Sequence, residues 1–317
     1  MQEYLSHFDG LMSDIKQNIE RAIIGKSQVI EHLLIALAAG GHVLIEDVPG
    51  IGKTTLAQAL ARSLDLSFNR IQFTPDIMPS DVSGFNLYNQ KTTEFEFQPG
   101  AVMTNILLAD EINRTSPKTQ SALLEVMQEN QVTVDGKTYK IPQTFMVLAT
   151  QNPVEYLGTY PLPEAQLDRF LMKVRLGYPS IEEEIKILDV YGGEFDLDHV
   201  RPVARREEVS WMRQMGQQGH VAPGIMQYVS EIAQTTRRHS DVMRGMSPRA
   251  SQMLLAGGKA RALLHGRDFV RPDDIQALLQ VVLSHRIILQ PDSRLRRVSV
   301  NDVLTQIVEQ VPVRDRR

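Results

Sequence analysis

Hydrophobic residues in the first half of the chain follow helical and strand-like patterns in turn. Between residues 8 and 24 they recur every three or four positions, which predicts an amphipathic helix, and residues 27–39 predict a second one. Further helices are expected after Lys53 and at 118–129 and 163–170, and apolar runs that suit strands lie at 43–45, 69–73, 105–108, 144–149 and 171–176. Strands and helices therefore alternate up to Tyr178.

Two pairs of alternating segments predict β-hairpins. Residues 84–88 and 93–97 flank a polar turn. Residues 131–134 and 138–141 flank Asp135-Gly136, a dipeptide typical of tight hairpin turns. The first pair carries several aromatic side chains, which either pack against the body of the protein or form a contact surface.

The second half of the chain predicts a helical domain. Tyr178-Pro179-Ser180 interrupts the pattern, so we expect a boundary between residues 1–178 and residues 179–317. A polar stretch from residue 192 to Pro202 predicts a loop. Helices are expected from Ile181 onward and at 207–215, 223–236, 247–264, 272–285 and 300–309.

The stretch from Val43 to Thr55 predicts a phosphate-binding loop. A short apolar strand leads into a loop that contains Gly50 and Gly52, and Lys53-Thr54 then opens a helix. Glycines let the backbone approach an anion, and the N–H groups at the helix N-terminus point toward it. Lys53 can reach the β- and γ-phosphates of a nucleotide, and the Thr54 hydroxyl can hold Mg²⁺.

The loop departs from the general phosphate-loop pattern at one position. The pattern G-x-x-x-x-G-K-[ST] has a glycine where this chain has Asp47, which puts the phosphate geometry in question. A bare Gly-Lys-Ser/Thr tripeptide also occurs by chance in roughly one chain in six of this length. The prediction of a nucleotide site therefore depends on further signals.

Polar residues at the ends of later strands supply these signals. Asp110-Glu111 follows an apolar strand, where the first carboxylate can hold the Mg²⁺ shell and the second can orient an attacking water. Asn152 can hydrogen-bond the γ-phosphate or that water, or form an Asx turn before a proline. Arg169 either pairs with Asp168 on the surface or reaches the nucleotide of a neighbouring subunit.

Composition limits the class of protein. The 317 residues are 42% hydrophobic and 23% charged, which is typical of globular chains long enough for two domains. The absence of cysteine excludes disulfides and thiolate metal sites, and a net charge of −4 does not indicate a broad basic face for nucleic acid. No apolar stretch reaches the roughly 20 residues of a membrane span, and the N-terminus lacks a secretory pattern. We therefore expect a cytoplasmic protein without a membrane span.

The remaining charged and titratable residues add no further site. The eight histidines have no metal-ligand spacing with carboxylates, so we predict no structural metal. Arg294, Arg296 and Arg297 are expected to form a solvated face.

These segments together resemble the AAA+ ATPases and, within them, the MoxR family. The resemblance is carried by Glu46-Asp-Val-Pro-Gly-Ile-Gly-Lys-Thr-Thr and by the run from Ala109 to Glu129 that begins Ala-Asp-Glu-Ile-Asn-Arg. Ala149-Thr-Gln-Asn-Pro, Pro163-Glu-Ala-Gln-Leu-Asp-Arg-Phe and Met246-Ser-Pro-Arg-Ala add to it. Their order and spacing cover roughly residues 20 to 300, nearly the whole chain.

The resemblance implies an α/β fold. Its AAA+ P-loop core would be a parallel five-stranded sheet with flanking helices, followed by an all-α lid domain. Two hairpins, at about 84–97 and 131–143, would be the helix-2 insert and the pre-sensor-1 hairpin, which in related proteins face the pore or the substrate. Loop residues Asp47, Val48, Pro49, Gly50, Ile51, Gly52, Lys53, Thr54 and Thr55 would bind ATP together with Arg249, and Thr54 and Asp110 would hold Mg²⁺.

The resemblance also implies catalytic roles. Glu111 would be the catalytic base, and Asn152 resembles the sensor 1 residue. Arg169 resembles an arginine finger that acts on the next subunit, and Arg249 resembles the sensor 2 arginine of the lid. Arg114 is a further candidate for action on a neighbouring subunit.

The function implied is that of an ATP-driven chaperone or remodeller that matures partner complexes. Such proteins form rings, here expected to be hexamers, and their clients often contain von Willebrand factor A domains or need a metal cofactor inserted. One alternative is a nucleic-acid motor or loader, for which Lys137 and Lys140 are the only support and against which the acidic balance argues. Others are the ATPase subunit of a metal chelatase and a non-hydrolysing scaffold, the latter disfavoured by the presence of Asp110 and Glu111.

Overall fold

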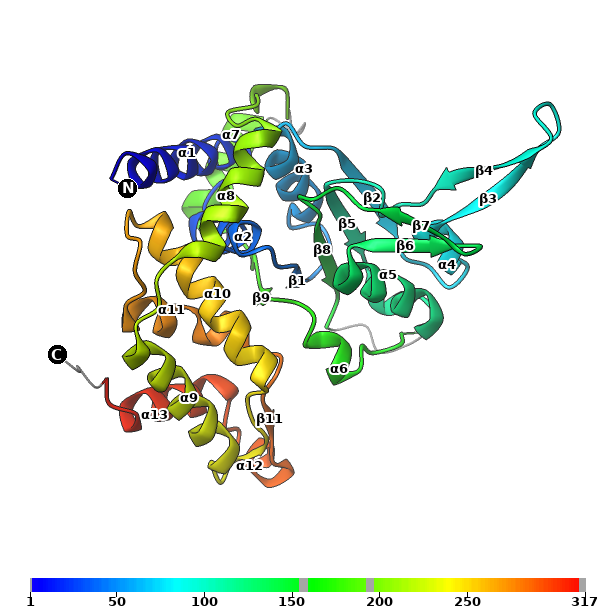
Figure 1. Cartoon of the computed structure of the whole chain (residues 1–317). Helices are drawn as coiled ribbons and strands as arrows, with labels where there is room; N and C mark the ends of the chain where they lie inside the picture. Colours follow the sequence, from blue (N-terminus) through cyan, green and yellow to red (C-terminus); the bar gives the residue numbers. More distant parts are fainter. Residues whose placement is uncertain (1, 154–158, 192–196, 314–317) are drawn as a thin grey trace.

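A five-stranded parallel sheet forms the centre of the protein, whose computed structural model describes residues 2–153, 159–191 and 197–313 (Figure 1). The strand order is β2-β5-β8-β1-β9, and each neighbouring pair is parallel. The strands are β1 (Val43–Glu46), β2 (Phe68–Gln72), β5 (Ile106–Asp110), β8 (Met146–Gln151) and β9 (Met172–Val174). Their carboxyl ends therefore meet at one edge of the sheet, and the predicted α/β class is confirmed.

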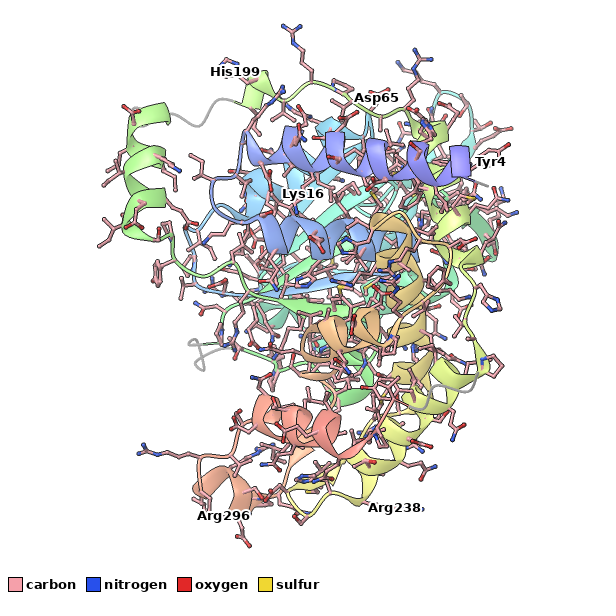
Figure 2. The ribbon with its side chains drawn as sticks, turned by 90° about the vertical axis from the view of Figure 1, so that its left-hand side faces the viewer. Tyr4, Lys16, Asp65, His199, Arg238 and Arg296 are labelled. Atoms are coloured by element: carbon pink, nitrogen blue, oxygen red, sulfur yellow. The ribbon has the colours of Figure 1, made fainter. Side chains whose placement is uncertain are left out.

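Alternate residues of the strands face two separate apolar cores. Ile106 and Leu108 of β5 pack into one core, whereas Leu107 and Ala109 pack into the other. The first core contains α1 (Gln2–Glu20), α2 (Ser27–Ala39) and α3 (Lys53–Ser63), and the second contains α4 (Pro79–Ser83) and α5 (Pro117–Glu129). Figure 2 shows α1 with Tyr4 and Lys16, lying along α2. Helices thus cover both faces, as a parallel sheet requires.

The first helix differs from its prediction at both ends. It begins at Gln2 rather than residue 8 and ends at Glu20 rather than residue 24. The N–H of Ala22 donates to the carbonyl of Ile19, which closes the helix in a tighter turn. The chain then turns at Gly25, which has a φ of 77°.

Both predicted hairpins are present and they contact each other. The first is β3 (Gly84–Asn89) with β4 (Glu94–Pro99), and the second is β6 (Gln131–Val134) with β7 (Lys137–Lys140). Phe97 stacks on Tyr139 of the second hairpin with ring centroids 3.9 Å apart. Farther out, Tyr88 and Phe95 are exposed, on a hairpin that projects from the body in Figure 1. The aromatic residues are therefore divided between packing and exposure.

The C-terminal part is helical, as predicted, but contains two additional short strands. Its elements are α7 (Ile181–Tyr191), η2 (Leu197–His199), α8 (Arg206–Gln218), α9 (Pro223–Arg238), β10 (Val242–Arg244), α10 (Pro248–Leu264), α11 (Pro272–Leu283), β11 (Ile288–Leu289), α12 (Pro291–Leu295) and α13 (Val300–Gln310). Strands β10 and β11 are antiparallel and too short to produce a recognisable alternation in the sequence. Part of the loop predicted from residue 192 lies outside the described residues. No helix among the described residues is long and apolar enough to cross a bilayer.

The helical part packs closely against the core. One apolar core continues from α1 and α2 into α8, α10 and α11, and the boundary expected after Tyr178 therefore stays a prediction. Arg286, between α11 and β11, is 3% exposed at its side chain and its Nε donates to Asp168 Oδ1 at 2.7 Å. Asp168 follows α6 (Glu164–Leu167) of the core, so this ion pair joins the two parts.

Gly216 of α8 approaches α2 so closely that a larger residue does not fit. A Cβ atom there would lie 2.4 Å from the carbonyl oxygen of Ala38. We therefore expect Gly216→Ala to lower the free energy of unfolding by about 1–3 kcal/mol through overpacking, measured by chemical denaturation. Gly10→Ala is the matched control, because nothing lies within 4 Å of that position and alanine favours the helix. Equal destabilisation by both substitutions would contradict the close contact.

Candidate active site

The loop between β1 and α3 has the geometry of a phosphate cradle. Gly50 and Gly52 have φ angles of 85° and 88°, a left-handed conformation that glycine adopts without strain. Gly52 caps the N-terminus of α3, so the N–H groups of the first helical turn are available to an anion. The Lys53 ammonium donates to the carbonyl oxygens of Asp47 at 3.1 Å and Val48 at 3.2 Å. Backbone and lysine together suit a triphosphate.

Asp47 departs from the general loop pattern without distorting the loop. It is not among the described residues with positive φ, so this turn does not require a glycine. Its Oδ2 accepts the N–H groups of Leu176 at 2.6 Å and Gly177 at 2.8 Å. The side chain therefore attaches the loop to the segment that follows β9.

Asp110 ends β5 at the same edge of the sheet. Its Oδ1 accepts the hydroxyl of Thr150 at 2.5 Å, and its Oδ2 accepts an N–H of Arg70 at 2.7 Å. These donors come from β8 and β2, the strands on either side of β5. A threonine hydroxyl at Thr54 and a carboxylate at Asp110 are oxygen ligands of the kind that Mg²⁺ prefers. Within the described part of the chain, no three or more His, Asp or Glu side chains form a separate metal site.

Glu111 is held by two neighbouring side chains. Its backbone has a φ of 55°, and its N–H donates to the Thr150 hydroxyl at 2.9 Å. Its Oε2 accepts Nε2 of Gln72 at 2.9 Å and Nη1 of Arg114 at 2.8 Å. While both bonds persist, this oxygen is occupied and cannot freely take a proton from water.

One cavity of about 770 Å³ joins the loop to the two acidic residues. Its polar lining includes Gly50, Gly52, Lys53, Thr54, Thr55, Arg70, Gln72, Asp110 and Glu111. Its apolar lining includes Ile23, Ile24, Tyr178, Ile187 and Leu188. A cavity with a phosphate-binding end and an apolar end suits a nucleotide.

Asn152 lies between the loop and the acidic residues. It follows β8, which separates β1 from β5 in the sheet, and it is buried. The N–H of Asp47 donates to the carbonyl of the preceding Gln151 at 3.1 Å. Asn152 is therefore at the edge of the sheet where the phosphate loop and Asp110 meet, although it does not line the cavity itself.

Arg169 and Arg249 lie elsewhere and do not line the cavity. Arg169 donates to the carbonyl of Leu124 in α5. Arg249 is in the first turn of α10, whose N-cap Ser247 donates its hydroxyl to Asp168 Oδ2 at 3.3 Å. The two arginines therefore belong to adjoining segments.

The position of Arg249 is also indicated by its electrostatic effect. Burial lowers the pKa of His42 to about 4, and the charges of Arg213 and Arg249 lower this pKa as well, against a hydrogen bond with the Met127 carbonyl. His42 comes just before β1, whereas the phosphate loop follows the other end of β1. The charge of Arg249 therefore affects a group, His42, at the end of β1 that is remote from the phosphate loop.

Glu46, the last residue of β1, is a buried anion with three polar partners. Burial opposes its ionisation, but hydrogen bonds from Arg175 and Lys173 outweigh this effect and hold the pKa of the carboxyl below its ordinary value. Nζ of Lys173 lies 3.2 Å from Oε2, and Nε2 of Gln151 lies 3.0 Å from Oε1. These bonds join β1 to both of its neighbouring strands immediately before the phosphate loop.

Arg70, Gln72 and Thr150 are site residues that the sequence alone did not identify. Each carries an ordinary polar side chain on a strand, and only the strand order places it beside Asp110 or Glu111. For Gln72 and Thr150 the available signal was a position near the carboxyl end of a predicted parallel strand, whereas Arg70 lies in the middle of β2 and gave no such signal.

Comparison with known proteins identifies the family. The chain is 49% identical to YeaC, an uncharacterized protein of Bacillus subtilis, over 98% of this chain and 97% of that protein. It is 40% identical to Chaperone MoxR1 of Mycobacterium tuberculosis over 92% of this chain and 80% of the relative. The chain belongs to the MoxR family of AAA+ ATPases.

Family profiles and a solved structure agree with this assignment. The profile described as "ATPase family associated with various cellular activities (AAA)" matches residues 42–172, and that of the AAA lid domain matches residues 234–307. A crystal structure of a proposed ATPase from Cytophaga hutchinsonii has a TM-score of 0.92 at 38% identity and covers 99% of this chain and 98% of its own. The MoxR-type chain is thus an ATPase with an AAA+ core and a helical lid, and its family binds nucleotide.

The contact of Gln72 with Glu111 generates a prediction for the MoxR-type site. We expect Gln72→Ala to raise the basal rate of ATP hydrolysis severalfold, because Glu111 then has one fewer hydrogen bond to break before it reaches water. The measurement is phosphate release at saturating ATP, with Gln17→Ala on the exposed surface of α1 as control. A basal rate equal to that of the control would show that Gln72 does not restrain Glu111.

Proposed function

We propose that this MoxR-family ATPase hydrolyses Mg-ATP and uses the cycle to mature or activate partner protein complexes. The observation that carries the proposal is the cavity that joins the phosphate loop to Asp110 and Glu111. The name of the Mycobacterium tuberculosis relative, Chaperone MoxR1, supports the remodelling part of the proposal. Neither a nucleic-acid motor nor a metal chelatase is favoured by these findings.

In the proposed cycle the chain's own residues bind and orient the nucleotide. The loop from Asp47 to Thr55 holds the phosphates, and Thr54 and Asp110 would hold Mg²⁺, which would supply neutralisation of the nucleotide's negative charge. Glu111 orients the attacking water and accepts its proton once Gln72 and Arg114 release the carboxylate. Asn152 orients the water from its position between β1 and β5.

A neighbouring subunit completes the site in this proposal. Arg169 and Arg249 do not line the cavity of their own chain, and they lie on adjoining segments joined by the bond between Ser247 and Asp168. A ring, expected to be a hexamer, would bring both arginines to the nucleotide of the next subunit. Arg114, the further candidate, contacts its own Glu111 instead and is proposed to restrain it.

The projecting hairpin is proposed as the surface that contacts the client. It projects from the body of the protein (Figure 1), and it carries four exposed apolar side chains that do not line the cavity, namely Phe85, Leu87, Tyr88 and Phe95. An exposed apolar group on a projecting hairpin suits a protein partner. Clients with a von Willebrand factor A domain, or with a metal cofactor to be inserted, remain the proposed class.

The role of Arg169 is tested by substitution. We expect Arg169→Ala to retain ATP binding and to lose about 10³–10⁵ of the turnover rate in the assembled protein, the usual worth of an arginine finger. Arg238→Ala, at the exposed end of α9, is the control. Mixing Arg169→Ala subunits with inactive Glu111→Gln subunits should restore activity. An Arg169→Ala subunit keeps its Glu111, and an adjacent Glu111→Gln subunit supplies the missing Arg169. A mixture as inactive as its parts would exclude action between subunits.

The remodelling function is tested by trapping the client. Glu111→Gln should bind ATP without hydrolysing it and hold any client that the ATP state grips. We would isolate this variant from the source cell in ATP and in ADP and identify the copurifying molecules by mass spectrometry. A protein complex recovered only in ATP supports the proposal. Nucleic acid recovered in place of protein would favour a motor or loader.

A further inference from the structure

The Asp47 carboxylate makes contacts that a phosphate loop does not need for binding phosphate. Its Oδ2 accepts two consecutive backbone N–H groups, those of Leu176 and Gly177, at 2.6 and 2.8 Å. Its Oδ1 lies 3.2 Å from the N–H of Val48 in the loop itself. One carboxylate thus spans the gap between the phosphate loop and the connection that leads from β9 to α7.

This connection carries the outer wall of the nucleotide cavity. Tyr178 and Pro179 line the cavity, followed by Glu184, Ile187 and Leu188 of α7. Helix α7 itself is weakly held, since Ile185 is 60% exposed and Leu188 is 70% exposed. Figure 2 shows α7 as the green helix at the left-hand edge of the molecule. The position of the wall therefore depends strongly on how residues 176–179 are attached.

Besides the packing of Leu176 in the apolar core, polar contacts from two other segments hold this connection. Lys26, at the start of α2, donates to the carbonyl of Tyr178 at 3.1 Å and lies 3.9 Å from the carboxylate of Glu183. Asp47 supplies the other attachment, from the phosphate loop. Only the second of these connects the wall directly to the residues that hold phosphate.

The backbone carbonyl of Asp47 accepts a hydrogen bond from the phosphate-binding lysine. Nζ of Lys53 donates to the carbonyl oxygens of Asp47 and Val48. A γ-phosphate competes with these carbonyls for the lysine ammonium, because it carries far more negative charge. Binding of phosphate therefore changes the forces on the residue whose side chain holds Leu176 and Gly177.

We propose that Asp47 is a positioning residue that couples occupancy of the phosphate loop to the placement of α7 over the bound nucleotide. The inference rests on the proposed ATPase site and adds a route by which phosphate binding controls the outer wall. A glycine at this position would leave the loop able to bind phosphate but would remove the connection. Asp47 does not need to touch the nucleotide. Its loss should therefore weaken the affinity for ATP more than it slows the hydrolysis step.

Kinetics of three variants test the coupling. Asp47→Ala and Asp47→Gly remove the acceptor of both N–H groups and should raise the KM for ATP on the order of tenfold or more, with a much smaller change in kcat. Asp47→Asn should restore much of the affinity, because its amide oxygen still accepts an N–H. Asp302→Ala is the matched control, since that carboxylate also accepts a backbone N–H, from Ser299 at 2.9 Å, but in the helical lid. A loss of kcat at unchanged KM would overturn the proposal.

Limited proteolysis gives a second readout that does not require hydrolysis. Arg175, whose side chain is 68% exposed, is a trypsin site directly before the attached residues, and the exposed Arg205 is an internal reference. A non-hydrolysable ATP analogue should slow cleavage after Arg175 in the unsubstituted protein and in Asp302→Ala, but not in Asp47→Ala. Equal protection in Asp47→Ala would contradict the coupling. If the unsubstituted protein hydrolyses no ATP, the proposed function fails, and the protection assay still decides the role of Asp47.

Discussion

Parallel pairing of β1 with β8 and β9 is the constraint on which the rest of the structure depends. It places the phosphate loop beside the carboxyl end of β8 and, one strand farther, beside Asp110 at the end of β5. It also places Val43 opposite Met172, so that β9 runs alongside the strand that leads into the loop. The buried Glu46 fixes this arrangement through Lys173 and Gln151. The polar site therefore follows from strand order rather than from any local property of the loop.

A second constraint comes from the buried guanidinium of Arg286. Burial of a charge is costly unless its hydrogen bonds are satisfied, and Arg286 satisfies them with Asp168 and with carbonyl groups that include that of Leu171. These residues lie on both sides of Arg169, so the lid determines the local backbone of the candidate finger. Lid position and finger position consequently cannot vary independently within one subunit.

Local patterns were sufficient to predict the five core strands, both hairpins and the phosphate loop. Apolar runs mark buried strands, and Asp135-Gly136 has the positive φ angles that its hairpin turn requires. The sequence could not predict partners that meet only after folding. Asp47 and Leu176 are separated by 129 positions, and Gln72 reaches Glu111 only because β2 pairs with β5. The sequence shows that Asp47 departs from the general phosphate-loop pattern. Its contacts with Leu176 and Gly177 become evident only once the end of β9 is placed beside the loop.

Strand β9 lies between the two constraints and joins them. Asp168, held by Arg286, and the adjoining Arg169 come before it, and Leu176 and Gly177, held by Asp47, come just after it. A strand of this length spans about 10 Å and is paired to β1 in register, so its two ends are joined by a short, hydrogen-bonded segment. In the coupling proposed for Asp47, the segment that responds to phosphate at one end carries the candidate finger at the other. In a ring as proposed, β9 would give each chain a direct path from its own nucleotide to that of its neighbour.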